Sequence, residues 1–536
     1  MTKMSDPWIA LIYPPVAKPA EPPAGIARLA GALRAANVGC RVIDANINGL
    51  CHLLNTVLPQ NDTWSARAFK HRDSHLYALR DPAVYARPDA YSRALADLGR
   101  LLHNAGQNTA ARPGLADFTH ARFSPVNSAD LRKAAQRPRD NPFHDYYQNH
   151  LAKEVLETGA RVAGISINYL SQALCGFALI GVLRQIRPDL RIILGGGLIT
   201  SWMRQPGWKN PFEGLVDALI CGPGEKALLE MAGCRDTGRL PAPLPDYADL
   251  AANPYLSPGF VLPYSASDGC WWKRCAFCPE KAEKRPFRPI ARSTAADQLR
   301  HLTQQFQPRL IHLLDNAISP ALLGQMVHTP PGAPWYGFVR MGPPLDNPGF
   351  CYKLAASGCV MLKLGLESGS QEVLDRLEKG INLKTASRVL NNLAQTGIAA
   401  YVYLLFGTPA ETRAAACQTL EFTAAHSPFI DFLNLAVFNL PAHSPEAQTL
   451  ESRNFYKGDL ALYRDFAHPF GWHRRQVRRF LKKHFKKHAA IRPIIRRDPP
   501  VFGANHAPFF PRPFSSRKKG GQCPVDFVFF QGYIRR

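Results

Sequence analysis

The sequence is most constrained by a group of three cysteines. Cys270, Cys275 and Cys278 lie within nine residues, spaced C-x4-C-x2-C, in the stretch Ser-Asp-Gly-Cys-Trp-Trp-Lys-Arg-Cys-Ala-Phe-Cys. Three thiolates on one loop can ligate three irons of a [4Fe–4S] cluster, and no fourth cysteine follows nearby. An iron without a protein ligand is open to a small molecule. We therefore expect a loop that presents three thiolates to one cluster.

A zinc site and a disulfide are the alternatives for these cysteines. Zinc normally takes four protein ligands in a structural site, and two close cysteine pairs would be the stronger zinc signal. A disulfide needs an oxidising compartment. The twelve cysteines are scattered apart from the group of three, as in a reducing cytoplasm, so a cytoplasmic location is expected and a disulfide is not favoured.

The stretch resembles the cluster loop of radical S-adenosylmethionine (SAM) enzymes, in which SAM binds the fourth iron. The usual spacing in that family is C-x3-C-x2-C, so this loop has one additional residue. The form Gly-Cys-x-Trp-x-Arg-Cys-x-Phe-Cys resembles a branch that often also carries a cobalamin domain. By this resemblance, Phe277 matches the aromatic residue that packs near the adenine of SAM.

The length and the charge of the chain indicate how many domains it has and which partners suit it. Its 536 residues suggest two to four domains. The formal charge of +24 favours an anionic partner, such as nucleic acid or an acidic peptide, or a membrane surface, and is also compatible with simple solubility. The apolar run that begins at Trp8 is too short for a signal peptide or a membrane span. No stable membrane insertion is expected.

The N-terminal part alternates strands and helices. Apolar runs predict strands at 8–13, 40–43, 162–167, 191–194 and 216–220, and helical periodicity predicts helices at 25–37 and 171–186. Such alternation indicates a parallel α/β sheet. Glycines follow two of these strands, at Gly195–Gly197 and in Gly222-Pro-Gly-Glu225. Ligands of open α/β sheets bind outside the carboxyl ends of the strands.

This pattern resembles the Rossmann-like, flavodoxin-like cobalamin-binding domain of B12-dependent radical SAM enzymes, here over residues 1–235. The resemblance implies cobalamin contacts at Pro15, Ser166, Gly195, Gly196, Gly197 and Glu225. The family usually has Gly-Glu-Gly-Glu where this chain has Pro223 in the second place. Taken singly, the glycines also fit plain turns.

The resemblance has one departure. Cobalamin domains that give a histidine to cobalt carry Asp-x-His-x-x-Gly after the first strand, whereas this chain has Tyr-Pro-Pro-Val-Ala-Lys there. The sequence Asp73-Ser-His75 imitates the motif after the second strand, and we interpret it as coincidence. A degenerate domain that kept the fold and lost the ligand is the alternative.

Two segments interrupt or follow this domain. Residues 49–150 are polar, rich in arginine and histidine and helical at 91–103, and we interpret them as an insertion near the ligand edge or a cap that contacts substrate. Residues 236–260 are rich in proline and are predicted to be a linker.

Six further apolar runs alternate with helical stretches and predict strands at 261–265, 310–314, 335–340, 360–366, 399–406 and 432–438. They match the partial (β/α)6 barrel of radical SAM enzymes, here over residues 261–444. In barrels of this kind, chemistry takes place at the C-terminal ends of the strands. The cysteine loop follows the first of these strands.

Polar residues end three of these strands. Asp315 and Arg340 end the second and third, and Gly-Leu-Glu-Ser-Gly-Ser ends the fourth and resembles the family's Glu-Ser-Gly-Ser segment. The resemblance implies that Asp315, Glu367 and Ser368 contact SAM and that Arg340 holds its carboxylate. A charge at a helix N-terminus is the alternative for Glu367. Catalytic residues are not identified.

The tail, residues 445–536, is expected to form a mainly helical basic region. Arginine and lysine doublets recur every four residues from Arg474 to Lys487, with Val477, Phe480, Leu481 and Phe485 between them. This predicts an amphipathic helix with a basic face. The face suits a membrane surface, nucleic acid or an anionic substrate, or is simply solvated.

The resemblance implies radical SAM chemistry, with a [4Fe–4S] cluster, SAM and cobalamin as cofactors and C-methylation of an unactivated carbon as the reaction. It also implies an electron donor such as flavodoxin or ferredoxin. A rearrangement, cyclisation or oxidation without methyl transfer is the second hypothesis. A nucleic-acid-binding protein with a structural cluster is the third. The substrate stays open among peptide, RNA and small metabolite.

Overall fold

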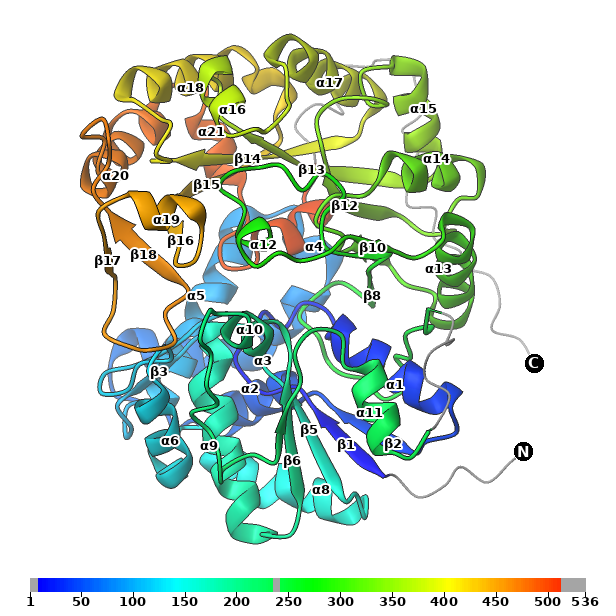
Figure 1. Ribbon diagram of the computed structural model, residues 1–536, viewed down its shortest axis with the longest axis vertical. Helices are drawn as coiled ribbons and strands as arrows, with labels where there is room; N and C mark the ends of the chain where they lie inside the picture. The colour runs from blue at the N-terminus through cyan, green and yellow to red at the C-terminus, as the bar shows by residue number, and fades with distance from the viewer. Residues whose placement is uncertain (1–7, 235–241, 512–536) are drawn as a thin grey trace.

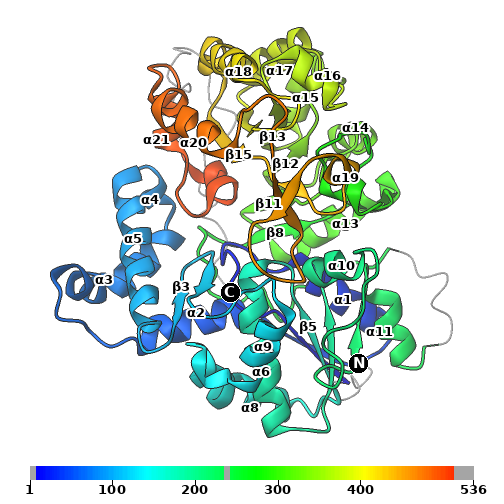
Figure 2. The ribbon, with the colours of Figure 1, turned by 60° about the vertical axis from the view of Figure 1, so that its left-hand side comes forward.

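The computed structural model describes residues 8–234 and 242–511. Two parallel sheets dominate it, one from the N-terminal part and one from residues 261–437, and they lie one above the other in Figure 1. Helices surround both sheets, and the helices α20 (Arg474–Lys483) and α21 (Arg492–Arg497) near the end of the described chain lie beside the barrel sheet, as the turned view in Figure 2 shows. None of the helices described has the length and apolar character that a membrane crossing needs.

The N-terminal sheet is parallel in the order β2-β1-β5-β6-β7. Counted along the chain, this is the flavodoxin-like order, whose ligand site lies where the strand order reverses. The reversal falls between β1 and β5, and both strands are buried on both faces. The elements are β1 (Ile9–Ile12), α1 (Ala24–Ala35), β2 (Cys40–Ile43), β5 (Val162–Ser166), α9 (Leu170–Ile186), β6 (Arg191–Gly195), α10 (Gly197–Met203), β7 (Ala218–Leu219) and α11 (Glu225–Met231).

The second sheet is a parallel six-stranded array in the order β15-β14-β13-β12-β11-β8, so each strand pairs with the next along the chain. This is the predicted (β/α)6 partial barrel, and its strands are apolar because helices cover them. The elements are β8 (Val261–Tyr264), α13 (Arg292–Phe306), β11 (Leu310–Leu313), α14 (Pro320–His328), β12 (Trp335–Val339), α15 (Pro348–Ala356), β13 (Cys359–Glu367), α16 (Gln371–Arg376), α17 (Leu383–Thr396), β14 (Ala399–Phe406), α18 (Arg413–Ala425) and β15 (Phe432–Val437).

The segment between β2 and β5 is mainly helical and packs beside the N-terminal sheet (Figure 2). Its α5 buries an apolar stripe that includes Leu95, Leu98 and Leu102. The elements are α2 (Ala45–Thr56), α3 (Thr63–Arg80), α4 (Pro82–Tyr85), α5 (Pro88–Ala105), β3 (Ala111–Pro113), β4 (Phe118–His120), α6 (Ser128–Gln136), α7 (His144–Tyr146), a π-helix (Tyr147–Leu151) and α8 (Ala152–Glu157).

The segment expected to be a linker is packed over residues 242–260, while 236–241 lie outside the described residues. Tyr247 is buried, and its hydroxyl donates to the Pro263 carbonyl. The Tyr255 hydroxyl donates to the Asp44 carboxylate at 2.7 Å. Asp44 also caps α2, and burial raises its pKa to about 6. The segment therefore connects the two sheets through buried side chains.

The C-terminal region contains a small antiparallel sheet and short helices. The predicted helix 474–487 is wrong in length, because α20 (Arg474–Lys483) ends at Lys483 and a 3-10 turn, Phe485–Lys487, follows. Its apolar side packs on the end of β14, where the Phe406 and Phe480 ring centroids are 6.3 Å apart. The other elements are β16 (Leu440–Pro441), α19 (Pro445–Thr449), β17 (Ser452–Asn454), β18 (Tyr463–Phe466) and α21 (Arg492–Arg497).

After α21 the chain returns to the helical insertion. His506 is fully buried, and its Nδ1 lies 2.8 Å from the hydroxyl of Tyr91. Tyr85 makes edge contacts with His506 and Phe510. Burial lowers the pKa of His506 to about 3, so the ring is neutral in this apolar surrounding. The end of the described chain thus completes the core of the insertion.

Candidate active site

The three cysteines lie on the loop after β8, at the C-terminal end of the barrel strands. Asp315, just beyond β11, holds the start of this loop by accepting from the Ala266 amide at 3.0 Å and from the Ser267 hydroxyl. Gly269 has a φ of +76°, and a Cβ there would meet the Pro286 carbonyl oxygen at 2.4 Å. Only glycine can adopt this backbone conformation so close to the Pro286 carbonyl. Gly269 therefore fixes the position of the backbone just before Cys270.

The loop rests on the turn that follows α16. The Trp272 indole donates to the Glu378 carbonyl at 3.0 Å, and the Ala276 amide donates to the Leu377 carbonyl at 3.0 Å. A Cβ on Gly380, whose φ is +62°, would meet the Trp272 ring at 2.2 Å. The ring therefore lies directly against the backbone of this turn.

Arg340, at the end of β12, lies on the other side of Trp272. Its guanidinium carbon is 3.9 Å from the Trp272 ring centroid and 5.7 Å from that of Trp271, and it donates to the Lys379 carbonyl. Burial lowers the pKa of Arg340, and the neighbouring cysteines Cys275 and Cys270 raise it. The cation is thus held beside the cysteine loop.

Glu367 ends β13 in the left-handed region, with a φ of +70°, beside a register shift in its pairing with β14. Its carboxylate accepts from the Lys379 ammonium at 2.8 Å, and both side chains are largely buried. Lys379 also lies 5.4 Å from the Phe277 ring centroid. Strained backbone of this kind persists where the surrounding structure demands it, often at functional sites.

Two of the predicted SAM contacts have other partners. Ser368 is fully buried, and its hydroxyl lies 3.1 Å from that of Thr419 on α18, so its side chain faces a helix. Asp315 is also buried, and both of its oxygens serve the cysteine loop. The structure thus gives Ser368 and Asp315 supporting positions, while Phe277, Arg340 and Glu367 gather near Cys275.

The cysteines lie in a mixed environment. Burial raises the pKa of Cys275, and Lys379 and Arg340 lower it. Burial also raises the pKa of Cys278, and backbone amides at the start of α12 (Pro279–Ala282) lower it. Burial is the larger effect, so both pKa values are raised overall, and the cations and amides offset part of the cost of the thiolate form that metal binding requires.

A cavity of about 380 Å³ lies between the N-terminal sheet and the barrel. Ser166, Gly195–Gly197 and Glu225, for which the resemblance implies cobalamin contacts, line it from the first side. Gly269, next to Cys270, lines it from the second. Pro15 is buried and is not among the lining residues. The cavity therefore joins the carboxyl edge of the N-terminal sheet to the cysteine loop.

Charged groups close part of this cavity. Glu225 pairs with Arg28 at 2.5 Å, and Arg28 also reaches Asp268 at 3.2 Å, across to the cysteine loop. Glu280 lines the cavity from α12, and its Oε2 is buried with no hydrogen-bond partner among the described residues. Burial raises the pKa of Glu280. An unpartnered buried oxygen is costly, so it marks a position where a ligand donor would be stabilising.

A buried polar network occupies the barrel interior. The Lys363 ammonium on β13 lies 2.7 Å from His312 Nε2 on β11, and His312 Nδ1 lies 2.8 Å from Glu21, which follows β1. The His312 ring stacks on Tyr336 with centroids 4.3 Å apart. Burial lowers the pKa of Lys363 to about 7. The network ties the N-terminal part to the barrel strands.

Sequence reasoning missed several of these residues. Lys379, Gly380 and Glu280 lie in short helices or turns without a motif, and His312 lies within an apolar strand. The signal for His312 was the interruption of a buried strand by a polar residue, because such a residue needs a partner. The others depend on segments that meet only in the folded chain.

Comparison with known proteins shows a shared fold. No protein-family model matches the sequence, and no curated protein matches it. The chain is similar to a structure of OxsB, described as a cobalamin-dependent S-adenosylmethionine radical enzyme with aqua-cobalamin and S-adenosylmethionine bound. The TM-score is 0.55 at 13% identity, over 87% of this chain and 64% of OxsB.

A second similar structure is the radical S-adenosylmethionine methyltransferase TsrM from Kitasatospora setae, with its tryptophan substrate and the SAM analogue aza-SAM bound. The TM-score is 0.50 at 16% identity, over 84% of this chain and 79% of TsrM. The predicted architecture is thereby confirmed. The chain has the fold of these two enzymes, with a flavodoxin-like sheet ahead of a partial barrel.

Proposed function

We propose that this chain is a cobalamin-dependent radical SAM enzyme that methylates an unactivated carbon. When bound, the cluster and SAM supply a 5′-deoxyadenosyl radical that abstracts hydrogen from an unreactive C–H bond, and cobalamin supplies the methyl group. The fold shared with OxsB and TsrM supports the chemistry, since the OxsB structure is described with aqua-cobalamin and SAM bound and the TsrM structure with a SAM analogue bound. A cytoplasmic location suits such a cluster.

The residues around the cysteines fit a cluster and SAM. Cys270, Cys275 and Cys278 would hold three irons from one loop. Arg340 would hold the SAM carboxylate, because a guanidinium binds a carboxylate through two parallel hydrogen bonds. Glu367 would accept from the ammonium or the ribose hydroxyls of SAM. Trp271 Nε1, buried without a partner among the described residues, is a further donor close to Arg340.

The cavity at the sheet edge fits part of a cobalamin. Glycines line it, and nothing lies within 4 Å of a Cβ built on Gly25 or on Gly222. Backbone without side chains allows a bulky ligand to approach closely. Glu280 Oε2 would accept a hydrogen bond from an amide of the ligand. The segment after β1 contains no histidine at residues 14–19, so cobalt would take no ligand from there.

The protein's own contribution would be orientation and exclusion of water. The Trp272 hydrogen bond to Glu378 fixes the cysteine loop, and the Glu367–Lys379 pair fixes the end of β13. The cavity continues from the cobalamin side to Gly269, so a methyl donor there would lie close to the cluster.

One observation carries this proposal: three cysteines on the first strand loop of a parallel six-stranded barrel, joined by a cavity to a flavodoxin-like sheet. The deciding experiment is anaerobic reconstitution followed by reductive SAM cleavage, measured as 5′-deoxyadenosine. The chain should bind about four irons and cleave SAM. A chain that binds iron and cleaves no SAM under reduction would contradict the radical SAM assignment.

Cobalamin is tested separately. Hydroxocobalamin should bind about one to one, and Gly25→Phe, which fills the open space beside a cavity-lining glycine without a left-handed φ, should prevent binding while SAM cleavage continues. A wild-type chain that carries its cluster and binds no cobalamin would reject methyl transfer. The alternative would then be a rearrangement, cyclisation or oxidation by the same radical.

The substrate or its carrier is proposed to be anionic, whether peptide, RNA or metabolite. Nine exposed cations lie on α20, the turn after it and α21: Arg475, Arg478, Arg479, Lys482, Lys483, Lys486, Lys487, Arg492 and Arg496. The apolar residues of α20 face the barrel, which leaves none for insertion into a membrane surface. Arg474 holds α20 beside β15 through Asn439 at 2.6 Å. An electron donor such as flavodoxin or ferredoxin is also proposed.

A further inference from the structure

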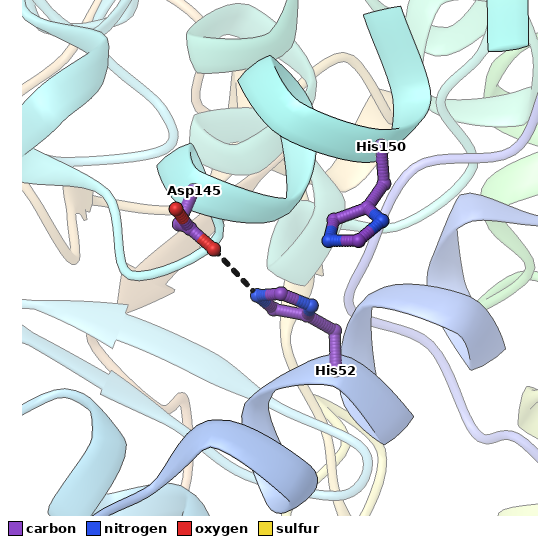
Figure 3. Close-up of side chains that lie close together, drawn as sticks. All are labelled: His52, Asp145 and His150. Carbon is purple, nitrogen blue, oxygen red and sulfur yellow. Dashed lines mark hydrogen bonds and ion pairs between the residues drawn. The ribbon is translucent and has the colours of Figure 1, made fainter. Parts of the chain in front are cut away.

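A second group of potential metal ligands lies in the helical insertion, apart from the cysteine loop. His52 on α2, Asp145 on α7 and His150 on the π-helix point toward one another in Figure 3. One ligand atom from each residue lies within 4.8 Å of the other two. His52 Nε2 is 2.9 Å from Asp145 Oδ2, and the two imidazole centroids are 4.9 Å apart.

We propose that His52, Asp145 and His150 bind a divalent transition-metal ion, with Zn²⁺ as the best fit. Two imidazoles and one carboxylate form a ligand set for Zn²⁺ or Fe²⁺, whereas Mg²⁺ and Ca²⁺ prefer oxygen ligands. Zn²⁺ binds such a site more tightly than Fe²⁺ in the Irving–Williams order. Water would complete the coordination, because Asp145 is 63% exposed and His52 is 13% exposed.

The neighbouring residues orient these ligands. The Asn149 amide donates to Asp145 Oδ1 at 2.6 Å, which leaves Oδ2 directed at His52. The His150 ring stacks beside Tyr146 with an interplanar angle of 18°. The π-helix Tyr147–Leu151 sets the position of His150, and π-helical turns are frequent at functional sites. Carboxylates that bind metals are themselves usually held by hydrogen bonds.

A similar trio in the same insertion shows an arrangement in which the carboxylate already has other partners. His71 and His75 on α3 have ring centroids 5.9 Å apart, and His75 Nε2 lies 3.0 Å from Asp97. Asp97, however, also accepts from Arg67 and Trp64, both at 2.8 Å, and is almost fully buried. Its negative charge is paired with Arg67, and both of its oxygens already have hydrogen-bond partners. Asp145 has no lysine or arginine ion-pair partner in the described ranges.

The position of the trio indicates its role. His52 lies on the helix that follows β2, and Asp145, 93 residues later, lies just before the helices that lead into β5. A metal here would join the two ends of the insertion where they leave and rejoin the N-terminal sheet. It would be a structural site, and it does not depend on the radical chemistry proposed above.

The test measures Zn²⁺ bound to the full chain after equilibrium dialysis against buffered Zn²⁺, by elemental analysis. His150→Ala should lose one equivalent of Zn²⁺ relative to wild type, whereas His71→Ala, which removes an imidazole from the same insertion, should lose none. Zn²⁺ on thiols is common to all three proteins and cancels. Asn149→Ala should keep the site with about 10- to 100-fold weaker affinity.

Fe²⁺ added anaerobically should bind the same site more weakly. Added Zn²⁺ should also slow proteolysis within residues 57–143 in wild type and His71→Ala, but not in His150→Ala. Equal Zn²⁺ on all three proteins would overturn the proposal. Circular dichroism would show whether His150→Ala is folded, and His52→Gln provides a second variant with the same expected loss.

Discussion

Gly380→Ala is the sharpest probe of the candidate SAM site, because Gly380 supports Trp272 and Trp272 supports Arg340. The φ of +62° costs an L-residue about 1–2 kcal/mol. The new Cβ would also lie 2.2 Å from the Trp272 ring, and such overpacking costs about 1–3 kcal/mol more. The ring must therefore move, and the contact with Arg340 at 3.9 Å would be lost.

The matched control is Gly159→Ala. Gly159 has a φ of +68°, and nothing lies within 4 Å of its Cβ position. It carries the same backbone cost without the collision. The free energy of unfolding should fall by about 1–2 kcal/mol in the control and by about 2–5 kcal/mol in Gly380→Ala.

The decisive measurement is the KM for SAM in reductive cleavage by cluster-loaded protein. A cation–π contact contributes about 0.5–2 kcal/mol, so Gly380→Ala should raise this KM by about 2- to 30-fold. Gly159→Ala should leave it unchanged. Equal KM values in the two variants, at equal iron content, would show that Trp272 does not position Arg340 for SAM.

Three further predictions concern other parts of the chain. Replacing any one of the three loop cysteines by Ala should abolish SAM cleavage and lower bound iron, whereas Cys221→Ala, which changes an exposed thiol, should do neither. Burial lowers the pKa of Lys363 from 10.5 to about 7 in the folded chain. Between these two pH values, the unfolded chain therefore binds more protons at Lys363 than the folded chain does. The free energy of unfolding should therefore rise by about 2 kcal/mol from pH 7 to pH 9 in urea titrations, with no such rise from this group in Lys363→Met. Changing Lys482, Lys483, Lys486 and Lys487 to Gln should raise the KM for an anionic substrate at low salt without altering SAM cleavage in its absence, and an unchanged KM would indicate a solvated face.

The strands and their order were accessible from the sequence because buried parallel strands are short apolar runs bounded by turns. The runs Cys40–Ile43 and Ala399–Phe406 were placed without error, and the others within one or two residues. The cysteine loop was also predictable, since three thiols in nine residues have few other uses.

The features that could not be predicted from the sequence depend on contacts between segments that are far apart along the chain. The contact between Trp272 and Gly380 joins residues that lie more than a hundred positions apart, so no local pattern encodes it. Ser368 matched a motif, but the presence of Thr419 on a neighbouring helix decided where its hydroxyl points. The basic helix ended early because Phe485 packs against Phe406, which the doublet repeat could not show. Proline in residues 242–260 suggested a linker, although the tyrosines among them are buried.

The contact between His506 and Tyr91 has a consequence for how the chain folds while the ribosome makes it. The two residues lie 415 positions apart. At about 5–20 residues per second, a ribosome needs roughly 20–80 s to pass from one to the other. Throughout that interval the growing chain would expose the aromatic side chains of Tyr85 and Tyr91, because their partner does not yet exist. The insertion would be synthesised early, and its core would be completed only when His506 has been made, so its aromatic residues are a place where a chaperone would act on the nascent protein.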